Sequence, residues 1–161
     1  MVRVASGHCG AEYYRMRDET AKRLAADIFL AAPFIQHLGA SVTNAKQGWI
    51  EASLPLTPWM MQQDGVAHAG IGTSFADHAM GAAAYTMMPP GFTPLSVEIT
   101  VRLLRPARGD RLRCTATVLK PGRRVISVEA DVWCSDSMGN ETHIMRTGAT
   151  MAVVQVETDA S

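Results

Sequence analysis

Residues 68–88 read HAGIGTSFADHAMGAAAYTMM, a stretch that is small and apolar on almost every side. A helix with such a composition is buried on most of its faces. The sequence PPG at 89–91 ends it, because proline cannot continue a helix. We therefore expect one buried helix over residues 68–88.

The segments on both sides of this helix alternate between apolar and polar residues, as half-buried strands do. Short strands are expected near 38–46 and 48–56, and longer ones over 96–103, 111–118, 126–133 and 143–154. The joints RPARGD (105–110), KPGRR (120–124) and DSMGN (136–140) are turn-like. Consecutive strands on short turns form an antiparallel sheet with one wet face. The other face needs an apolar cover, so the sequence predicts an α+β fold in which a curved antiparallel sheet wraps the buried helix.

An amphipathic helix is expected at the N-terminus over residues 11–32, with Pro33 stopping it. We accordingly divide the chain into an N-terminal tail and helix (1–33), a main domain (34–156) and a C-terminal tail (157–161). His8 and Cys9 lie in a glycine-flanked stretch that is typical of a mobile end.

Composition excludes several classes of protein. The chain has 161 residues, 47% of them hydrophobic, which fits one domain and argues against long disorder. Fifteen basic and fifteen acidic residues cancel, which disfavours a nucleic-acid binder. There is no apolar run long enough for a membrane span and no secretory signal, so no membrane partner is expected. Three scattered cysteines predict reduced thiols in the cytoplasm and no metal site.

Asp77 is the anomaly of the buried helix, because a carboxylate in apolar surroundings must be paired, hydrogen-bonded or protonated. Acid/base catalysts need such surroundings to shift their pKa, so Asp77 is a candidate catalytic residue. A purely structural carboxylate, satisfied by backbone groups or by His78, is the alternative. The residue types alone leave both interpretations open.

His68 stands where the helix begins, at a place where unpaired N–H groups can hold a developing oxyanion. The N–H groups of Ala69 and Gly70 are the candidate donors, although a lone histidine is more often a capping or core residue than a catalyst. His68 and Asp77 are nine residues apart, so they lie on opposite faces of one helix. Two copies of the chain could bring them together, which predicts a site shared across a two-fold interface. The amide of Gln62, in the preceding loop, could donate to a carbonyl or orient a water.

Two further sets of residues have both a structural and a functional interpretation. The methionines near these elements either fill core gaps or form a pliable lining for an acyl chain or ring (Met60, Met61, Met80, Met87, Met88). The basic residues around two turns are either a solvated edge or attract a phosphate-bearing ligand (Arg105, Arg108, Arg111, Arg113, Lys120, Arg123, Arg124).

The string QQDGVAHAGIGTSFADHAMGAAA (62–84) resembles the hotdog-fold acyl-CoA thioesterases, in the branch typified by the phenylacetate-pathway thioesterase. That family has Gln or Asn, five residues, His-Gly-Gly, and then Asp or Glu nine residues after the His. Gln62, His68 and Asp77 occupy these positions. The segment 95–124, with its LRP–GD turn and its Gly-Arg-Arg loop, is similar to the next strand pair of the family.

The resemblance implies the hotdog fold, with protomers pairing sheet edge to sheet edge as a dimer or dimer of dimers. It implies hydrolysis of acyl-CoA thioesters without a cofactor, since coenzyme A is part of the substrate. Asp77 would be general base or nucleophile, the Ala69 N–H would polarise the thioester carbonyl, Gln62 would hold the carbonyl or water, and His68 would orient the loop. The remaining positions would bind substrate: Ser96 and Val97 along the pantetheine, and Arg105, Arg123 and Arg124 at the nucleotide phosphates.

Two departures from the family pattern matter. Ala69 replaces the first glycine after the histidine, which preserves the N–H donor if the backbone there does not need a positive φ. Gly81 stands where some relatives carry Ser or Thr, one turn after the acid. The alternatives are a non-catalytic acyl-CoA-binding or sensing protein on the same fold, or a hotdog hydratase, whose acid and histidine follow other spacings.

Overall fold

The computed structural model describes residues 17–156, which form one six-stranded antiparallel sheet and three α-helices. The sheet order is β1-β2-β4-β5-β6-β3. The strands are β1 (Ser41–Lys46), β2 (Trp49–Pro55), β3 (Phe92–Leu103), β4 (Arg111–Lys120), β5 (Val125–Ser135) and β6 (Glu141–Gln155). The helices are α1 (Asp18–Leu30), α2 (Pro33–Leu38), the 3₁₀ turn η1 (Pro58–Met60) and α3 (Ala69–Tyr85).

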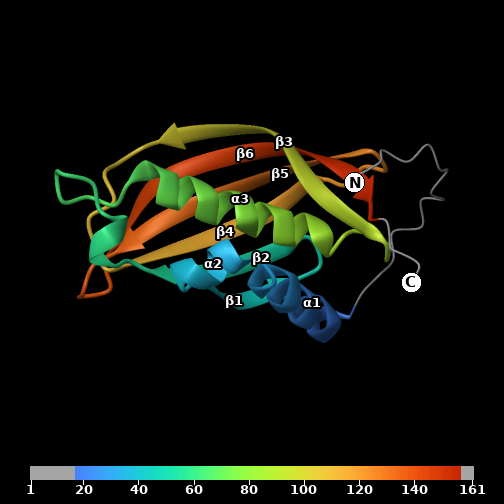
Figure 1. Cartoon of the computed structure of the whole chain (residues 1–161), viewed down its shortest axis with the longest axis horizontal. Helices are drawn as coiled ribbons and strands as arrows, with labels where there is room; N and C mark the ends of the chain where they lie inside the picture. Colours follow the sequence, from blue (N-terminus) through green and yellow to red (C-terminus); the bar gives the residue numbers. More distant parts are fainter. Residues whose placement is uncertain (1–16, 157–161) are drawn as a thin grey trace.

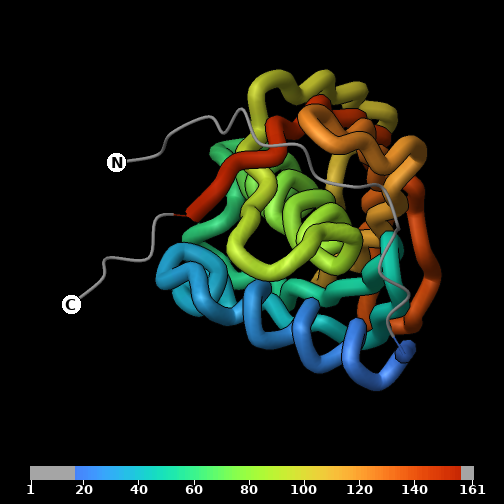
Figure 2. The backbone as a smooth tube through the Cα atoms, turned by 90° about the vertical axis from the view of Figure 1, so that its right-hand side faces the viewer, coloured from blue at the N-terminus to red at the C-terminus, as the bar shows by residue number. Residues whose placement is uncertain are grey.

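The sheet curves around α3, as the sequence predicts (Figure 1). Figure 2 shows α3 within the curve of the strands, and α1 packs against both β1 and α3. The helix buries Phe75, Ala79 and Met80 completely, and the sheet supplies residues such as Ile50 and Leu112. Burying one such large side chain contributes about 1.5–3 kcal/mol, so this contact holds the two layers together. None of the helices in residues 17–156 has the length and apolar character that a membrane span requires.

The N-terminal region differs from the predicted single helix over residues 11–32, because the first helix ends before residue 32 and a second one follows. Helix α1 begins at Asp18 and ends at Leu30, while residues 11–16, His8 and Cys9 lie outside the described residues. Pro33 does not merely stop a helix; it is the first residue of α2, where its missing N–H costs nothing. Gly39, with φ of 73°, ends α2, so the strand predicted from residue 38 begins at Ser41.

Helix α3 is shorter at its C-terminal end than predicted, because it ends at Tyr85 and not at residue 88. Thr86 is the C-cap of the helix. Its hydroxyl donates to the Ala83 carbonyl at 2.7 Å and accepts from the Gly48 N–H at 2.7 Å. These bonds fasten the end of the helix to the turn between β1 and β2.

Strand β3 is a sheet edge whose apolar row is not covered, contrary to the expectation of a buried face. Val97 and Leu103 are each 62% exposed, and within residues 17–156 the strand pairs only with β6. Ser96 pairs with Met151 and Glu98 with Thr150, so Val97 is the extra residue of a β-bulge. The alternation of apolar and polar residues predicted that the strand has an apolar side, but it could not predict what covers that side. Pro94 fits here because an edge strand can dispense with one N–H.

His78 connects α3 to α1. Its Nε2–H donates to the Phe29 carbonyl at 2.9 Å, and the two rings meet edge to face. Phe29 belongs to the last turn of α1, whose carbonyls lack partners within the helix. The bond therefore fixes the C-terminal end of α1 against the middle of α3.

We expect the protein to lose stability in mild acid through His78. Burial lowers the pKa of His78, outweighing the bond to Phe29 and the charge of Asp77, which both raise it. The unfolded chain then binds a proton more readily, so the free energy of unfolding falls as the pH drops below about 6.5. Thermal unfolding between about pH 7.5 and pH 5.5 should show this decrease, and it should be smaller in His78→Gln. An equal decrease in the variant would contradict the assignment to His78.

Candidate active site

A pocket of about 530 Å³ opens beside the first turn of α3. Backbone bonds fix the loop that precedes the helix: the His68 N–H donates to the Met60 carbonyl at 2.8 Å, and the Ala67 N–H donates to the Ala107 carbonyl at 3.0 Å. The loop is thereby tied to the turn before β4. Gly72 lines the pocket against Met145, whose methyl group would lie 3.0 Å from an added Cβ.

His68 is the N-cap of α3, and this corrects the expectation for Gly70. The Nδ1 atom of His68 accepts the Gly70 N–H at 3.0 Å, so that N–H is already bonded and is not a free oxyanion donor. A Cβ at Gly70 would lie 2.9 Å from the same Nδ1 atom. Glycine at this position therefore lets the imidazole close over the helix end.

Ala69 is the first residue of α3, and its N–H has no acceptor among the described residues. Within residues 17–156 no residue other than glycine has a positive φ, so alanine is unstrained at position 69 although the family pattern has glycine there. The free N–H lies at the positive end of the helix dipole and beside the pocket. It can donate to a carbonyl oxygen that gains negative charge.

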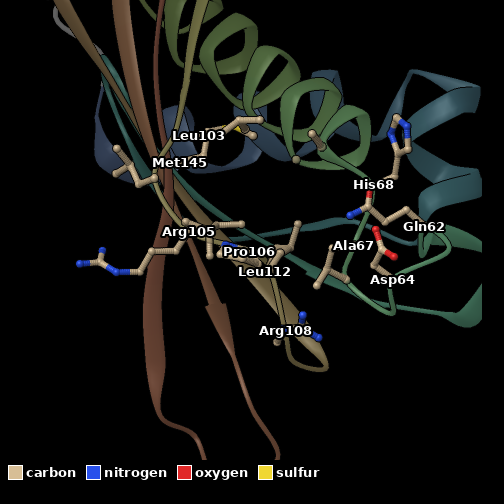
Figure 3. A pocket seen from close by; sticks show the side chains of 16 residues that line it. Gln62, Asp64, Ala67, His68, Leu103, Arg105, Pro106, Arg108, Leu112 and Met145 are labelled. Carbon is tan, nitrogen blue, oxygen red and sulfur yellow. The ribbon is translucent and has the colours of Figure 1, made fainter.

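The polar side chains of the pocket come from two loops (Figure 3). Gln62, Asp64 and His68 gather on one side, and Arg108 stands on the turn before β4. Arg105 lines the pocket with its stem, but its guanidinium extends away and donates to the His143 carbonyl at 3.2 Å. Asp64 was not predicted as a site residue, because an Asp-Gly pair is an ordinary turn signal.

Asp77 lies elsewhere on α3 and does not line this pocket. Its Oδ1 accepts the Ser96 hydroxyl at 2.7 Å, so Ser96 and not His78 is its hydrogen-bond partner. The side chain is half-buried between α3 and the edge strand β3. A hydroxyl donor holds the carboxylate in one orientation and leaves its other oxygen for a second partner.

Within one protomer the predicted site residues form separate groups. Gln62, His68 and Ala69 share the pocket at the helix start, whereas Asp77 lies about 12 Å along the helix axis from Ala69, too far for one carbonyl carbon to touch both. Val97 stands exposed on β3 next to Ser96.

The two basic groups lie at opposite ends of the sheet. Arg123 and Arg124 are in the turn after β4, while Arg105 is in the turn before it. No three His, Cys, Asp or Glu side chains in residues 17–156 gather as a metal site would require.

Known proteins resemble this chain in sequence and in fold. Residues 64–139 match the model of the thioesterase superfamily. A curated protein of Haemophilus influenzae, named an esterase, is 29% identical over 98 residues, which cover 61% of this chain and 71% of that protein. The crystal structure of a thioesterase family protein from Silicibacter pomeroyi is 32% identical, with a TM-score of 0.79 over 83% of this chain and 97% of that one.

The structure of PaaI from the phenylacetic acid degradation operon of Escherichia coli is also similar, with a TM-score of 0.74 over 87% of this chain and 99% of that one. At 17% identity this likeness shows the fold alone. A curved antiparallel sheet around a central helix is thus the hotdog fold of thioester hydrolases. The chain belongs to the thioesterase superfamily.

Proposed function

We propose that the protein hydrolyses acyl-CoA thioesters at a site built by two copies of the chain. One observation carries the proposal: the free Ala69 N–H and Asp77 have the chemistry for this reaction but lie apart in one protomer. A partner's α3 would bring its N-terminus to the Asp77 side of this helix. The family resemblance implies such an arrangement.

Asp77 would act as general base or as nucleophile. As a base, it takes a proton from water while the hydroxide adds to the carbonyl carbon. The C–S bond of the tetrahedral intermediate then breaks, and the Asp77 carboxyl gives its proton to the departing sulfur, so that coenzyme A leaves as a thiol and the carboxylate is restored. As a nucleophile, it displaces the thiol and forms an anhydride that water hydrolyses. The Ser96 hydroxyl, 2.7 Å from Oδ1, would hold the carboxylate in place for either route.

The partner's first turn of α3 would stabilise the oxyanion. A fixed N–H donor that points at developing charge is worth more in a water-poor cleft than in solution. Gln62 would bind the carbonyl or the water, and His68, bonded to Gly70, would keep the turn in position.

The exposed apolar row of β3 supports the pairing of protomers. Unpaired strand edges are ready to pair with another chain, and this edge adds apolar side chains to its free backbone groups. The exposed apolar residues of β3 are Leu95, Val97, Ile99 and Leu103. A dimer, or a dimer of dimers, would cover it.

The basic residues would bind the coenzyme A phosphates. Arg108 lines the pocket, and Arg105 could join it if its guanidinium left the His143 carbonyl. Arg123 and Arg124 lie at the other end of β4, so they would serve a site formed with the partner. The expected location is the cytoplasm, where thiols such as the free Cys114 and Cys134 stay reduced. Burial raises the pKa of Cys134 to about 11, which keeps that thiol unreactive.

Incubating the purified protein with a panel of acyl-CoAs and a thiol reagent tests the proposal. We expect thiol release from at least one member, and a size measurement showing a dimer or larger assembly. Binding without release from any member would contradict hydrolysis and favour a sensing protein. A monomer at working concentration would contradict the shared site.

A further inference from the structure

Strand β6 forms one wall of the pocket at the start of α3, and a β-bulge shapes this wall. Val132 of β5 pairs with Met145 and Trp133 pairs with His143, so Ile144 is the extra residue of β6. Ile144 and Met145 are consecutive, yet both are buried and both line the pocket. Neighbouring side chains of a regular strand point to opposite faces, so it is the bulge that turns both of them inward.

The carbonyl groups of the bulge hold the turn that follows β3. The Ile144 carbonyl accepts the Leu104 N–H at 2.9 Å and the Arg105 N–H at 3.4 Å. The His143 carbonyl accepts the Arg105 guanidinium at 3.2 Å, which keeps this charged group outside the pocket (Figure 3). Leu104 and Arg105 also line the pocket. The position of the bulge therefore fixes two adjoining parts of the pocket wall.

A histidine–aspartate pair fastens the bulge from the other face of the sheet. The Nε2 atom of His143 lies 2.8 Å from Oδ1 of Asp131 on β5. Both atoms are buried, and among the described residues neither has another hydrogen-bond partner. A carboxylate oxygen can only accept, so Nε2 carries the hydrogen of this pair. Moving the bulge would leave two buried polar atoms unpaired, and the cost of doing so opposes the movement.

Stacking holds the imidazole of His143 in this orientation. The ring stacks on Trp133, with centroids 5.1 Å apart. The guanidinium of Arg113 on β4 lies 4.2 Å from the centroid of the same Trp133 ring, and it donates to both carboxylate oxygens of Glu141 at 2.7 Å. Side chains from three neighbouring strands thus fix the ring that bonds Asp131.

We propose that His143 is a positioning residue for the pocket at the helix start: through its bond to Asp131 it holds the bulge so that Ile144 and Met145 face the bound thioester. This inference rests on the proposed thioester hydrolysis. His143 does not line the pocket itself, so it acts through the residues that follow it in β6. An apolar wall contacts the substrate in the ground state and in the transition state alike. Its displacement should therefore weaken binding more than it slows the chemical step.

Two substitutions at His143 separate its hydrogen bond from its ring. His143→Phe keeps a ring to stack on Trp133 but cannot donate to Asp131, whereas His143→Gln offers an amide N–H in place of Nε2–H. In His143→Phe, KM for hexanoyl-CoA should rise about tenfold, within the range for residues that act through packed neighbours, while kcat changes less than about twofold. His143→Gln should keep KM near the wild-type value. A folded His143→Phe variant with the wild-type KM would overturn the proposal.

Removing the other half of the pair should have the same effect. Asp131→Ala should raise KM as His143→Phe does, and the double variant should be no worse than either single one, because both changes break one interaction. Multiplication of the two effects in the double variant would count against the pair. Arg146→Gln is the matched control: it removes an ion pair of the same face, to Glu129 at 2.7 Å, and should keep KM within about twofold of the wild type.

Hydrogen exchange gives a readout that needs no turnover. The amides of Leu104 and Arg105, both bonded to the Ile144 carbonyl, should exchange faster in His143→Phe than in the wild type and in His143→Gln. Unchanged exchange in a folded His143→Phe variant would overturn the positioning role whatever the activity. If His143→Phe does not fold, Asp131→Ala serves for both measurements. If the wild type hydrolyses no acyl-CoA, the proposed function fails, while faster exchange with weaker calorimetric binding of hexanoyl-CoA would still support the role of His143.

Discussion

Replacing Asp77 by asparagine should lower kcat for thioester hydrolysis by at least about a hundredfold, the low end for removal of a general acid or base. Asparagine has nearly the same shape, and its carbonyl oxygen can still accept the Ser96 hydroxyl. What it lacks is a group that takes a proton from water or attacks the carbonyl carbon. Because the substitution removes the reactive carboxylate but keeps the shape of the side chain and its hydrogen bond, KM should change much less than kcat.

The control for this prediction is Asp27→Asn, which removes the same charge from an exposed position on α1. It should hydrolyse thioesters at the wild-type rate, and both variants should unfold near the wild-type temperature. Activity of Asp77→Asn within a few-fold of the wild type would exclude either catalytic role for this carboxylate.

The parts of the fold that depend on burial alone were predictable. The composition of residues 68–88 could only belong to a helix that is covered on most sides, and α3 occupies 69–85. Strands β4 and β5 bury alternate residues, as their pattern predicts. In each case one local rule, the repeat of the hydrophobic pattern, decides the structure.

The errors arose where one residue type serves two purposes. Pro33 can stop a helix or start one, and the sequence does not say which of the two occurs. The apolar row of β3 was assigned to the core, but an edge strand can present such a row to a partner. Gly70 was expected to offer its N–H, yet the neighbouring His68 side chain reaches it first.

Residue spacing along α3 predicted the arrangement of the site better than residue type did. Nine residues between His68 and Asp77 predicted that one helix separates them, and only His68 lines the pocket at the helix start. Spacing could not predict that Ser96 would hold Asp77, because that contact depends on the position of the bulge in β3. Spacing likewise could not predict where the arginine side chains point, since the guanidinium of Arg105 donates to the His143 carbonyl.

Replacing Ala69 by proline should lower kcat about 10²–10³-fold, the usual cost of removing one oxyanion donor. Proline deletes the N–H that is free in this structure, and the first position of a helix is where proline is tolerated. His68, with φ of −60° and ψ of 132°, already has the extended backbone that a residue before proline needs. Ala69→Gly keeps the N–H and is the matched control; it should remain active. An active Ala69→Pro variant would exclude this N–H as the donor.

Mixed oligomers of Ala69→Pro and Asp77→Asn then test where the two groups meet. If each site takes its carboxylate from one protomer and its helix end from the other, a mixed dimer contains one site in which both groups are intact. Random pairing should restore about one quarter of the wild-type activity, although each variant alone is nearly inactive. Co-expression with two different tags, followed by purification on both, should enrich the mixed species and raise the activity per protomer toward about one half. Failure to recover activity in a mixed species that is shown to form would mean that the N–H and the carboxylate do not serve one site across the interface.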